Sequence, residues 1–365
     1  MKNHRVVVTR LGGPEVLEVI EEDLPEPRRA EVRVRVLAMG VSFADILLRE
    51  GIHPEARKPP FTPGWDIVGV VDLVGADVAS VELGDVVAAL PVVGGYTEYV
   101  VLPASELLPV PSGADPASTV ATVLNYATAY QMMHRIAHVR SEERVLIHGA
   151  GGGVGTALLQ LGSLAGLEMY GTARPDKHPS IRELGAHPID YTVCDFVAEV
   201  DKLTNGVGVD VVFDGIGADH VDVSYRTLRR GGRVIAYGHA TSLIDRTLTH
   251  GRRSRFRGLP GLAVQIIKHS LVPDGRRVRI YSIQTLKKRH PDWFRQDMAT
   301  LFDLLVDGKI TPIIAHDLPL ADAARAHEVL GGGHVTGKIV LHNPDTQAHP
   351  DQPSLQAMRH QGGVG

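Results

Sequence analysis

The chain has 365 residues, a formal net charge of −4 and a single cysteine. Apolar residues make up 44% and charged residues 22%, which is typical of a globular protein and excludes a disordered chain. The net charge gives no overall electrostatic reason to bind nucleic acid or an anionic membrane. One cysteine, Cys194, excludes an intrachain disulfide and a cysteine-rich zinc site. Without a signal-peptide pattern or a long apolar run, the sequence predicts a cytoplasmic enzyme or binding protein.

Short β-type runs dominate residues 1–124. "RVVVTR", "EVRVRVLAMGV", "DIVGVVDLVG" and "YTEYVVLP" are rich in valine and are separated by turns that contain glycine, proline and aspartate. This pattern predicts a twisted, barrel-like β domain.

The pattern changes after Thr119. "VATVLNYATAYQMMHRIAHV" has helical periodicity, and strand-like runs such as "RVLIHG", "VDVVFDGIG" and "GGRVIAYG" then alternate with helix-like segments. Short apolar strands between helices are typical of a parallel sheet that is buried on both faces. The segment therefore predicts a doubly wound α/β domain.

The last third of the chain predicts a helix from about Asp292 to Val306, and then one more helix and a final strand within "LPLADAARAHEVLGGGHVTGKIVLH". These elements most simply return to the first domain. We therefore expect a catalytic domain from residues 1–124 and 290–344, a dinucleotide-binding domain at 125–289, and a flexible tail at 345–365.

A glycine-rich turn joins a predicted strand to a predicted helix in "RVLIHGAGGGVGTALLQLGSLAG". In this setting glycine permits a tight turn and close approach of backbone N–H groups to a pyrophosphate. The strict G-x-G-x-x-G spacing is not met, because Ala150 occupies its first position. The alternative is a turn that is glycine-rich only for tight packing.

The next strand ends in "GTARPDK", where an acidic residue would select the unphosphorylated dinucleotide. Arg174 follows Ala173 there, and Lys177 comes three residues later. Two cations suit a 2′-phosphate and predict NADPH. If the Asp176 side chain faces the ligand, the prediction of NADPH is weakened. The alternative is that Arg174 and Lys177 are solvated loop charges without a ligand.

Several motifs together resemble the medium-chain dehydrogenase/reductase superfamily, in its zinc-independent quinone oxidoreductase (zeta-crystallin-like) branch. They include "GVSFADILLREGIHP", "PGWDIVGVVDLVG", "GGYTEYVVLP", "LNYATAY", "HGAGGGVGTALLQL" and "VTGKIVL". The resemblance covers roughly residues 5–342. It implies an α/β protein with a GroES-like, β-barrel-type catalytic domain and a Rossmann domain, and it accounts for the alanine at position 150.

The resemblance also implies which residues form the site. Zinc-dependent relatives carry a cysteine and a histidine where this chain has Ser42 and Trp65, so no metal is expected. The catalytic positions implied are Ser42, Asp45, His53 and Asn125, and of these His53 replaces a tyrosine and is either a proton donor or a solvent-facing residue. The cofactor positions are Tyr126, Thr128, Gly152, Gly153, Val154, Gly155, Arg174, Lys177, Tyr191, Gly238 and Lys338; Tyr126 is core packing alone in the alternative reading.

Without a metal, hydride transfer suits acceptors whose conjugation spreads the incoming charge, so the expected substrates are quinones and α,β-unsaturated carbonyls. The alternative function is an NADPH-binding redox sensor or a structural, crystallin-like protein with little catalysis. The family also implies a homodimer, paired through "RVRIYSI". Basic runs between residues 250 and 289 are either a solvated face or a contact for an acidic group on the substrate.

Overall fold

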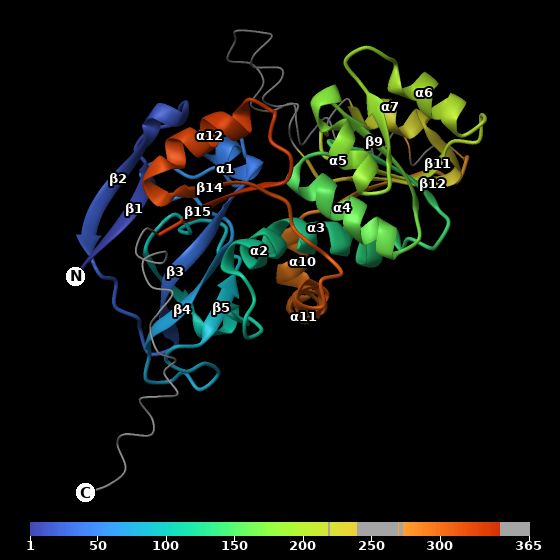
Figure 1. The fold of residues 1–365 in the computed structure, drawn as a ribbon. Coiled ribbons are helices and arrows are strands. Elements are labelled where there is room, and N and C mark those ends of the chain that lie inside the picture. Colours follow the sequence, from blue (N-terminus) through green and yellow to red (C-terminus); the bar gives the residue numbers. More distant parts are fainter. Residues whose placement is uncertain (218–219, 239–268, 270–272, 344–365) are drawn as a thin grey trace, which may run out of the picture.

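The computed structural model describes residues 1–217, 220–238, 269 and 273–343 (Figure 1). Two separate sheets organise this part of the chain, one at each end of the molecule. The predicted tail at 345–365 and most of the basic segment 250–272 lie outside the described residues. No described helix is long and apolar enough to cross a lipid bilayer.

The first sheet is the predicted β domain. Its strands run in the order β14-β15-β3-β4-β5-β7, and β6 pairs with β3. The bounds are β3 (Glu31–Val41), β4 (Ile67–Val74), β5 (Val86–Ala89), β6 (Tyr99–Pro103), β7 (Leu108–Pro109), β14 (Ile314–Pro319) and β15 (Lys338–His342), and a separate ribbon pairs β1 (Lys2–Val8) with β2 (Leu17–Asp23).

Alternation along β3 shows why this sheet forms. Val32, Val34 and Val36 are fully buried, while the charged residues between them are partly exposed. β15 pairs antiparallel with β3, with Ile339 opposite Val41. The end of the described chain therefore returns to the N-terminal sheet, as predicted.

The second sheet is parallel throughout, in the order β10-β9-β8-β11-β12-β13. Its strands are β8 (Arg144–His148), β9 (Glu168–Ala173), β10 (His187–Asp190), β11 (Val209–Asp214), β12 (Leu228–Ala236) and β13 (Arg277–Ile280); the helices between them are α4 (Gly153–Leu164), α5 (His178–Glu183), α6 (Phe196–Leu203) and α7 (His220–Arg226), with the short helix η5 (Pro175–Lys177) before α5. This is the strand order of a dinucleotide-binding fold, so the predicted fold class is confirmed.

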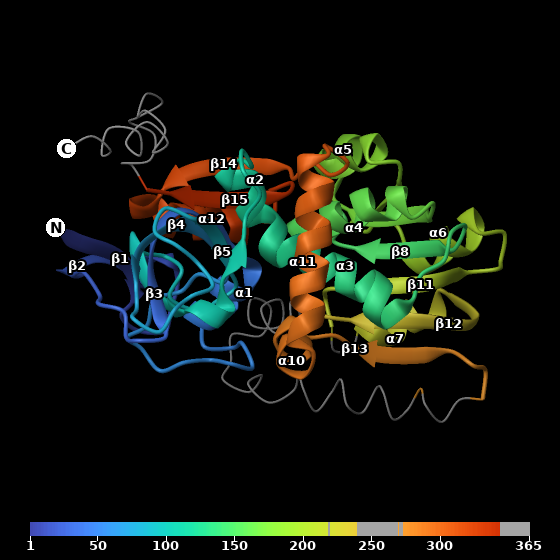
Figure 2. The same ribbon diagram turned by 90° about the horizontal axis from the view of Figure 1, so that it is seen from below.

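Helices fill the junction between the sheets, and Figure 2 shows α11 standing between them. The junction contains α2 (Pro116–Ala121), η3 (Thr122–Tyr126), α3 (Ala127–Tyr130), η4 (Gln131–Ala137), α10 (Ile283–Arg289) and α11 (Pro291–Val306). The carboxylate of Asp297 on α11 accepts hydrogen bonds from Gln131 (2.9 Å) and Arg135 (2.8 Å). These buried contacts attach α11 to the helices that precede β8.

The remaining helices of the described chain belong to the first domain. They are α1 (Phe43–Arg49), α12 (Ala323–Gly331), and the short helices η1 (Pro14–Val16), η2 (Ala104–Glu106) and η7 (Leu320–Asp322). Two details differ from the sequence reading. The helix α1 was not predicted, and "RVRIYSI" is a strand only as far as Ile280, because the Ser282 side chain accepts a hydrogen bond from the Thr285 N–H and so begins α10.

Candidate functional site

The glycine-rich turn lies between β8 and α4. Gly149 adopts a left-handed φ of 70°, and a Cβ there would meet nothing within 4 Å. A Cβ at Gly155 would overlap the carbonyl oxygens of Gly149 and Ala150, so the first turn of α4 packs directly on the loop backbone. The turn therefore needs glycine at 149 for its conformation and at 155 for close packing.

The N-terminus of α4 is suited to an anion. Gly152 is its N-cap residue and supplies no side-chain acceptor, so no side chain of the cap satisfies the first N–H groups of Gly153 and Val154. The helix has 12 residues, and its dipole adds positive potential at this end. Backbone N–H groups with open space beside Gly149 form a fitting place for a pyrophosphate.

Two cations follow the end of β9, which is the strand next to β8 and its glycine-rich turn. The Arg174 guanidinium lies 3.2 Å from His334 Nε2 and hydrogen-bonds the Tyr191 hydroxyl. The Lys177 ammonium donates to the Val335 carbonyl oxygen at 2.7 Å. Neither cation forms an ion pair within the described residues, although burial lowers the pKa of the Lys177 ammonium.

Asp176, which would weaken the NADPH prediction if it faced the ligand, has a partner of its own. Its Oδ2 lies 3.1 Å from His334 Nδ1, and this hydrogen bond holds the pKa of the Asp176 carboxyl below its usual value. Its carboxylate is thus engaged by a residue of the other domain.

The segment 334–337 crosses from the first sheet to the glycine turn. The Gly337 N–H donates to the Gly151 carbonyl oxygen at 3.1 Å, and Gly152 and Gly337 form an isolated parallel bridge. His334 and Val335 of the same segment touch Arg174 and Lys177. Sequence reasoning missed this contact, and its only signal was the "GGGHVTG" run before β15.

Asn125 and Tyr126 lie in η3, a π-type turn, and such turns often re-aim side chains at functional sites. A Cβ at Gly153 would overlap the Asn125 amide, so this side chain lies against the start of α4. The Tyr126 hydroxyl is buried with no partner among the described residues, and burial raises its pKa well above the usual value. An orphaned buried hydroxyl is suited to a ligand polar group.

Thr128 lies two residues beyond Tyr126 in the same helical stretch. It is buried and hydrogen-bonds the Tyr281 hydroxyl, which also donates to Gln131 Oε1 at 2.8 Å. Thr128 therefore connects the predicted cofactor segment to the end of the second sheet.

Ser42 and Asp45 belong to a buried hydrogen-bond network. Asp45 Oδ2 accepts from the Ser42 N–H (2.9 Å) and hydroxyl (2.7 Å), and Oδ1 accepts from the Gly64 N–H at 2.8 Å. The Tyr96 hydroxyl lies 3.5 Å away and is also 3.2 Å from His327 Nε2. Burial raises the pKa of Asp45 to about 6. Both side chains thus cap α1 and hold the Gly64 backbone in place.

His53 lies beside Trp65, with ring centroids 5.5 Å apart in an edge-on arrangement. Its Nδ1 accepts from the Glu55 N–H at 3.1 Å, so a neutral ring carries its proton on Nε2. The Trp65 Nε1 is buried without a partner among the described residues. This second orphaned donor was not among the predicted site residues.

Gly238 and Lys338 were predicted as cofactor contacts. A Cβ at Gly238 would overlap the backbone of Gly215, so the ends of β11 and β12 approach closely there. The Lys338 ammonium forms an ion pair with Asp66 Oδ2 at 2.9 Å, and both side chains are almost fully buried. The structure therefore engages Lys338 with Asp66 inside the first domain.

One group of His and Asp side chains in the described part of the chain has the spacing of a metal site: His148, Asp214 and His220. A serine hydroxyl already joins them, because Ser224 Oγ donates to Asp214 Oδ2 (2.7 Å) and lies 3.1 Å from His148 Nε2. His220 Nδ1 lies 2.9 Å from the same carboxylate oxygen. The cluster thus satisfies its own polar atoms at the ends of β8 and β11.

Comparison with known proteins agrees with this architecture. Residues 28–112 match the model of the alcohol dehydrogenase GroES-like domain, and residues 184–341 match that of the zinc-binding dehydrogenases. The Danio rerio synaptic vesicle membrane protein VAT-1 homolog is 32% identical over 341 residues, covering 92% of this chain and 69% of the relative. A Burkholderia 2-haloacrylate reductase is 32% identical over 346 residues, covering 92% of this chain and 97% of the relative.

Among solved structures, Escherichia coli quinone oxidoreductase complexed with NADPH superposes with a TM-score of 0.82 and 27% identity, covering 93% of this chain and 99% of that one. A fold with a GroES-like barrel, a dinucleotide-type sheet and a glycine turn at their junction defines a class of oxidoreductases. The chain belongs to the medium-chain dehydrogenase/reductase superfamily, in its quinone oxidoreductase branch.

Proposed function

We propose that this protein is an NADPH-dependent, zinc-independent oxidoreductase that reduces quinones or α,β-unsaturated carbonyls. The observation that carries the proposal is the cluster at the carboxyl ends of β8 and β9. There the open N-terminus of α4 stands beside Arg174 and Lys177, two cations that have no carboxylate partner among the described residues. A dinucleotide with a 2′-phosphate matches this arrangement.

The residues divide between two parts of the cofactor. Gly152, Gly153, Val154 and Gly155 would hold the pyrophosphate with backbone N–H groups, while Arg174, Lys177 and Tyr191 would hold the 2′-phosphate. The solved relative complexed with NADPH supports this choice of cofactor. When bound, NADPH supplies a hydride.

The chemistry of the acceptor follows from the donors that this chain offers. The hydroxyl of Tyr126 and the Nε1 of Trp65 are buried donors with no described partner, and His53 stands beside Trp65. Asn125 holds its amide against the start of α4. These groups can stabilise a developing enolate or quinol oxygen and deliver a proton, which is mild assistance. Conjugated acceptors suit it because they spread the incoming charge themselves.

The zinc-independent part of the proposal rests on two positions. Where zinc-dependent relatives carry ligands, this chain has Ser42, whose hydroxyl is bonded to Asp45, and the buried Trp65. Cys194 lies in the other domain, between β10 and α6. The residues present at this location do not fit a zinc ion.

Two names among the relatives bear on the substrate. A 2-haloacrylate is an unsaturated carboxylate and a quinone is a conjugated diketone, so both are electron-poor acceptors. Both names support the proposed substrate class, which includes quinones as well as α,β-unsaturated carbonyls.

The domain division and the oligomer also belong to this proposal. We keep residues 1–124 and 290–344 as the catalytic domain and 125–289 as the dinucleotide-binding domain, because the strands of the two sheets fall on either side of these limits. Among the described strands β13 is the last of its sheet, and its residue Ile280 is 47% exposed. A homodimer that pairs two copies of β13 would cover this edge.

The test is NADPH consumption by the full chain with a panel of ortho- and para-quinones, enones, simple ketones and, in reverse, primary alcohols with NADP⁺. We expect turnover only with the conjugated acceptors, slower turnover with NADH, and far less than one equivalent of zinc in chelator-free protein. Efficient turnover of an unconjugated alcohol, or a stoichiometric metal, would overturn the proposal. NADPH binding without turnover of any acceptor would favour the redox sensor or crystallin-like alternative.

A further inference from the structure

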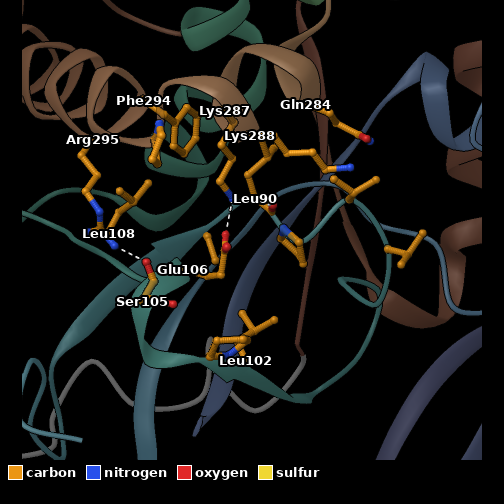
Figure 3. A pocket seen from close by; sticks show the side chains of 16 residues that line it. Leu90, Leu102, Ser105, Glu106, Leu108, Gln284, Lys287, Lys288, Phe294 and Arg295 are labelled. Carbon is orange, nitrogen blue, oxygen red and sulfur yellow. Dashed lines mark hydrogen bonds and ion pairs between the residues drawn. The ribbon is translucent and has the colours of Figure 1, made fainter. Parts of the chain in front are cut away.

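A cavity of about 480 Å³ opens between the first domain and the helices α10 and α11 (Figure 3). One wall is the segment Ala89–Val93 and the end of β6, and the other wall comes from α10 and the start of α11. None of the residues assigned above to the cofactor or to hydride transfer lines it. Its volume falls in the range of sites that bind small organic molecules.

Most of the cavity surface is apolar. Pro91, Val92 and Val93 contribute partly exposed apolar groups from the first domain, while Leu90, Leu108 and Phe294 also line the cavity but are almost fully buried. Such a surface favours a ligand with a hydrocarbon body, because burying that body removes apolar area from water.

The polar side of the cavity carries excess positive charge. Its lining includes Lys287, Lys288 and Arg295 but only one carboxylate, that of Glu106, which forms an ion pair with Lys287. Arg295 donates to the backbone carbonyl oxygens of Ser105 and Leu107. Among the described residues, therefore, neither Lys288 nor Arg295 has an acidic partner.

A buried donor on α10, the amide nitrogen of Gln284, has no acceptor among the described residues. Gln284 is only 8% exposed, lines the cavity, and has no described hydrogen-bond partner for its Nε2. A buried donor without a partner is unfavourable, and an acceptor group of a ligand would remove this cost. Gln284 and Lys288 are four residues apart on α10, so they lie on one face of the helix, and Figure 3 shows both among the lining side chains.

We propose that this cavity binds an organic carboxylate whose apolar body packs against the partly exposed Pro91, Val92 and Val93. The carboxylate accepts a hydrogen bond from Gln284 Nε2 and pairs with the Lys288 ammonium. A carboxylate matches one amide donor and one free cation beside an apolar wall. Binding requires no hydride transfer, so this proposal stands apart from the proposed reaction.

Calorimetric titration of the full chain with 4-phenylbutyrate, and with its neutral amide, tests the site. We expect saturable binding of the acid and at least about tenfold weaker binding of the amide, because the charged oxygen forms the stronger hydrogen bonds. Lys288→Ala and Gln284→Leu should each weaken binding of the acid by about tenfold. Lys288→Arg should retain most of it.

Arg289→Ala is the matched control, since it removes the same charge from the next residue of α10, which does not line the cavity. Equal affinity for acid and amide, equal loss in the Arg289 variant, or no saturable binding would each overturn the proposal. Thermal melting of every variant separates loss of the site from loss of the fold.

The same probe distinguishes two sources of the carboxylate. If the natural ligand is an acidic group of the substrate, 4-phenylbutyrate should raise the KM for an enone that carries a carboxylate without changing kcat. If it is a separate effector, the acid should bind without competing with that enone, so any change falls on kcat. The calorimetric result decides whether the cavity is a site, whatever the kinetic result is.

Discussion

Two polar clusters of this molecule have opposite character. In the first domain, the buried Asp45 carboxylate accepts hydrogen bonds from the Ser42 N–H, the Ser42 hydroxyl and the Gly64 N–H, all of which belong to the protein. Around Arg174, at the end of β9, the cations meet only a histidine ring, a tyrosine hydroxyl and a backbone carbonyl. Both clusters carry residues that the family resemblance assigns to the site.

This difference distinguishes residues that support the fold from residues that are available to a ligand, among those that the family resemblance assigns to the site. A buried carboxylate whose partners are all internal supports the fold, because removing it would leave those partners unpaired. A cation at the surface without a carboxylate partner contributes little to the fold and remains free for an anion. The following predictions test this distinction, beginning with the largest expected effect.

Asp45→Ala should lower the free energy of unfolding by about 4 kcal/mol, because the Gly64 and Ser42 N–H groups would lose their buried acceptor. Chemical denaturation measures this change. The matched control is Asp77→Ala, which removes a carboxylate from the exposed ion pair with Arg29 and should change stability very little. A loss of the same size in both variants would refute the scaffold role.

The stability contributed by Asp45 should depend on pH. Burial raises its pKa to about 6, so the folded chain holds this proton to a higher pH than the unfolded chain does. The protonated Asp45 therefore adds about 3 kcal/mol to the free energy of unfolding at pH values below the pKa of an ordinary aspartate. This contribution is lost as the pH rises through the pKa of about 6 in the folded protein.

The free energy of unfolding should be measured from pH 4 to 7 for the unmodified protein and for Asp45→Asn. Over this range the unmodified protein should lose more stability than the variant as the pH rises. Taking the difference removes the titrating groups that do not interact with Asp45. Parallel curves for the two proteins would contradict the prediction.

Replacing Arg174 and Lys177 together with alanine should weaken NADPH binding by about thirtyfold, since charge-assisted contacts to the 2′-phosphate are lost. NADH affinity and the melting temperature should stay nearly constant. Arg182→Ala, which removes a cation from the next helix α5, is the control for general electrostatic attraction. Equal losses for NADPH and NADH would show that these cations do not select the cofactor.

The smallest effect is expected at His53. His53→Ala should lower turnover with enones several-fold but leave quinone turnover nearly unchanged, because reduced quinones take protons from water. The quinone rate in the same variant is the internal control. An unchanged enone rate would remove His53 from the mechanism.

Much of this fold follows from sequence patterns that are local. Alternating valines predict β3, and glycine between a strand and a helix predicts the turn before α4. Lys338 shows where such reading ends. Its ion pair with Asp66 joins residues 272 positions apart, and no local pattern contains that information. The contact between Gly151 and Gly337 was missed for the same reason.

The candidate site was predictable to a similar degree. Arg174 and Tyr191 lie together because they follow the neighbouring parallel strands β9 and β10, while their role in binding a cofactor stays a prediction. Ser42 and Asp45 were predicted as catalytic positions, and the hydrogen bonds that the structure gives them support the backbone. The unpaired atoms of Tyr126, Trp65 and Gln284 depend on three-dimensional packing, which no spacing in the sequence reveals.

The bridge between Gly152 and Gly337 has a consequence for the newly made chain. A ribosome completes all six parallel strands of the second sheet before it adds the segment 334–337, which lies against their glycine turn. Domains generally fold as units while synthesis proceeds. The glycine turn of the nascent protein is therefore formed before Gly337 reaches it, so the contact that joins this turn to the first domain forms only once the last described strand, β15, has been made.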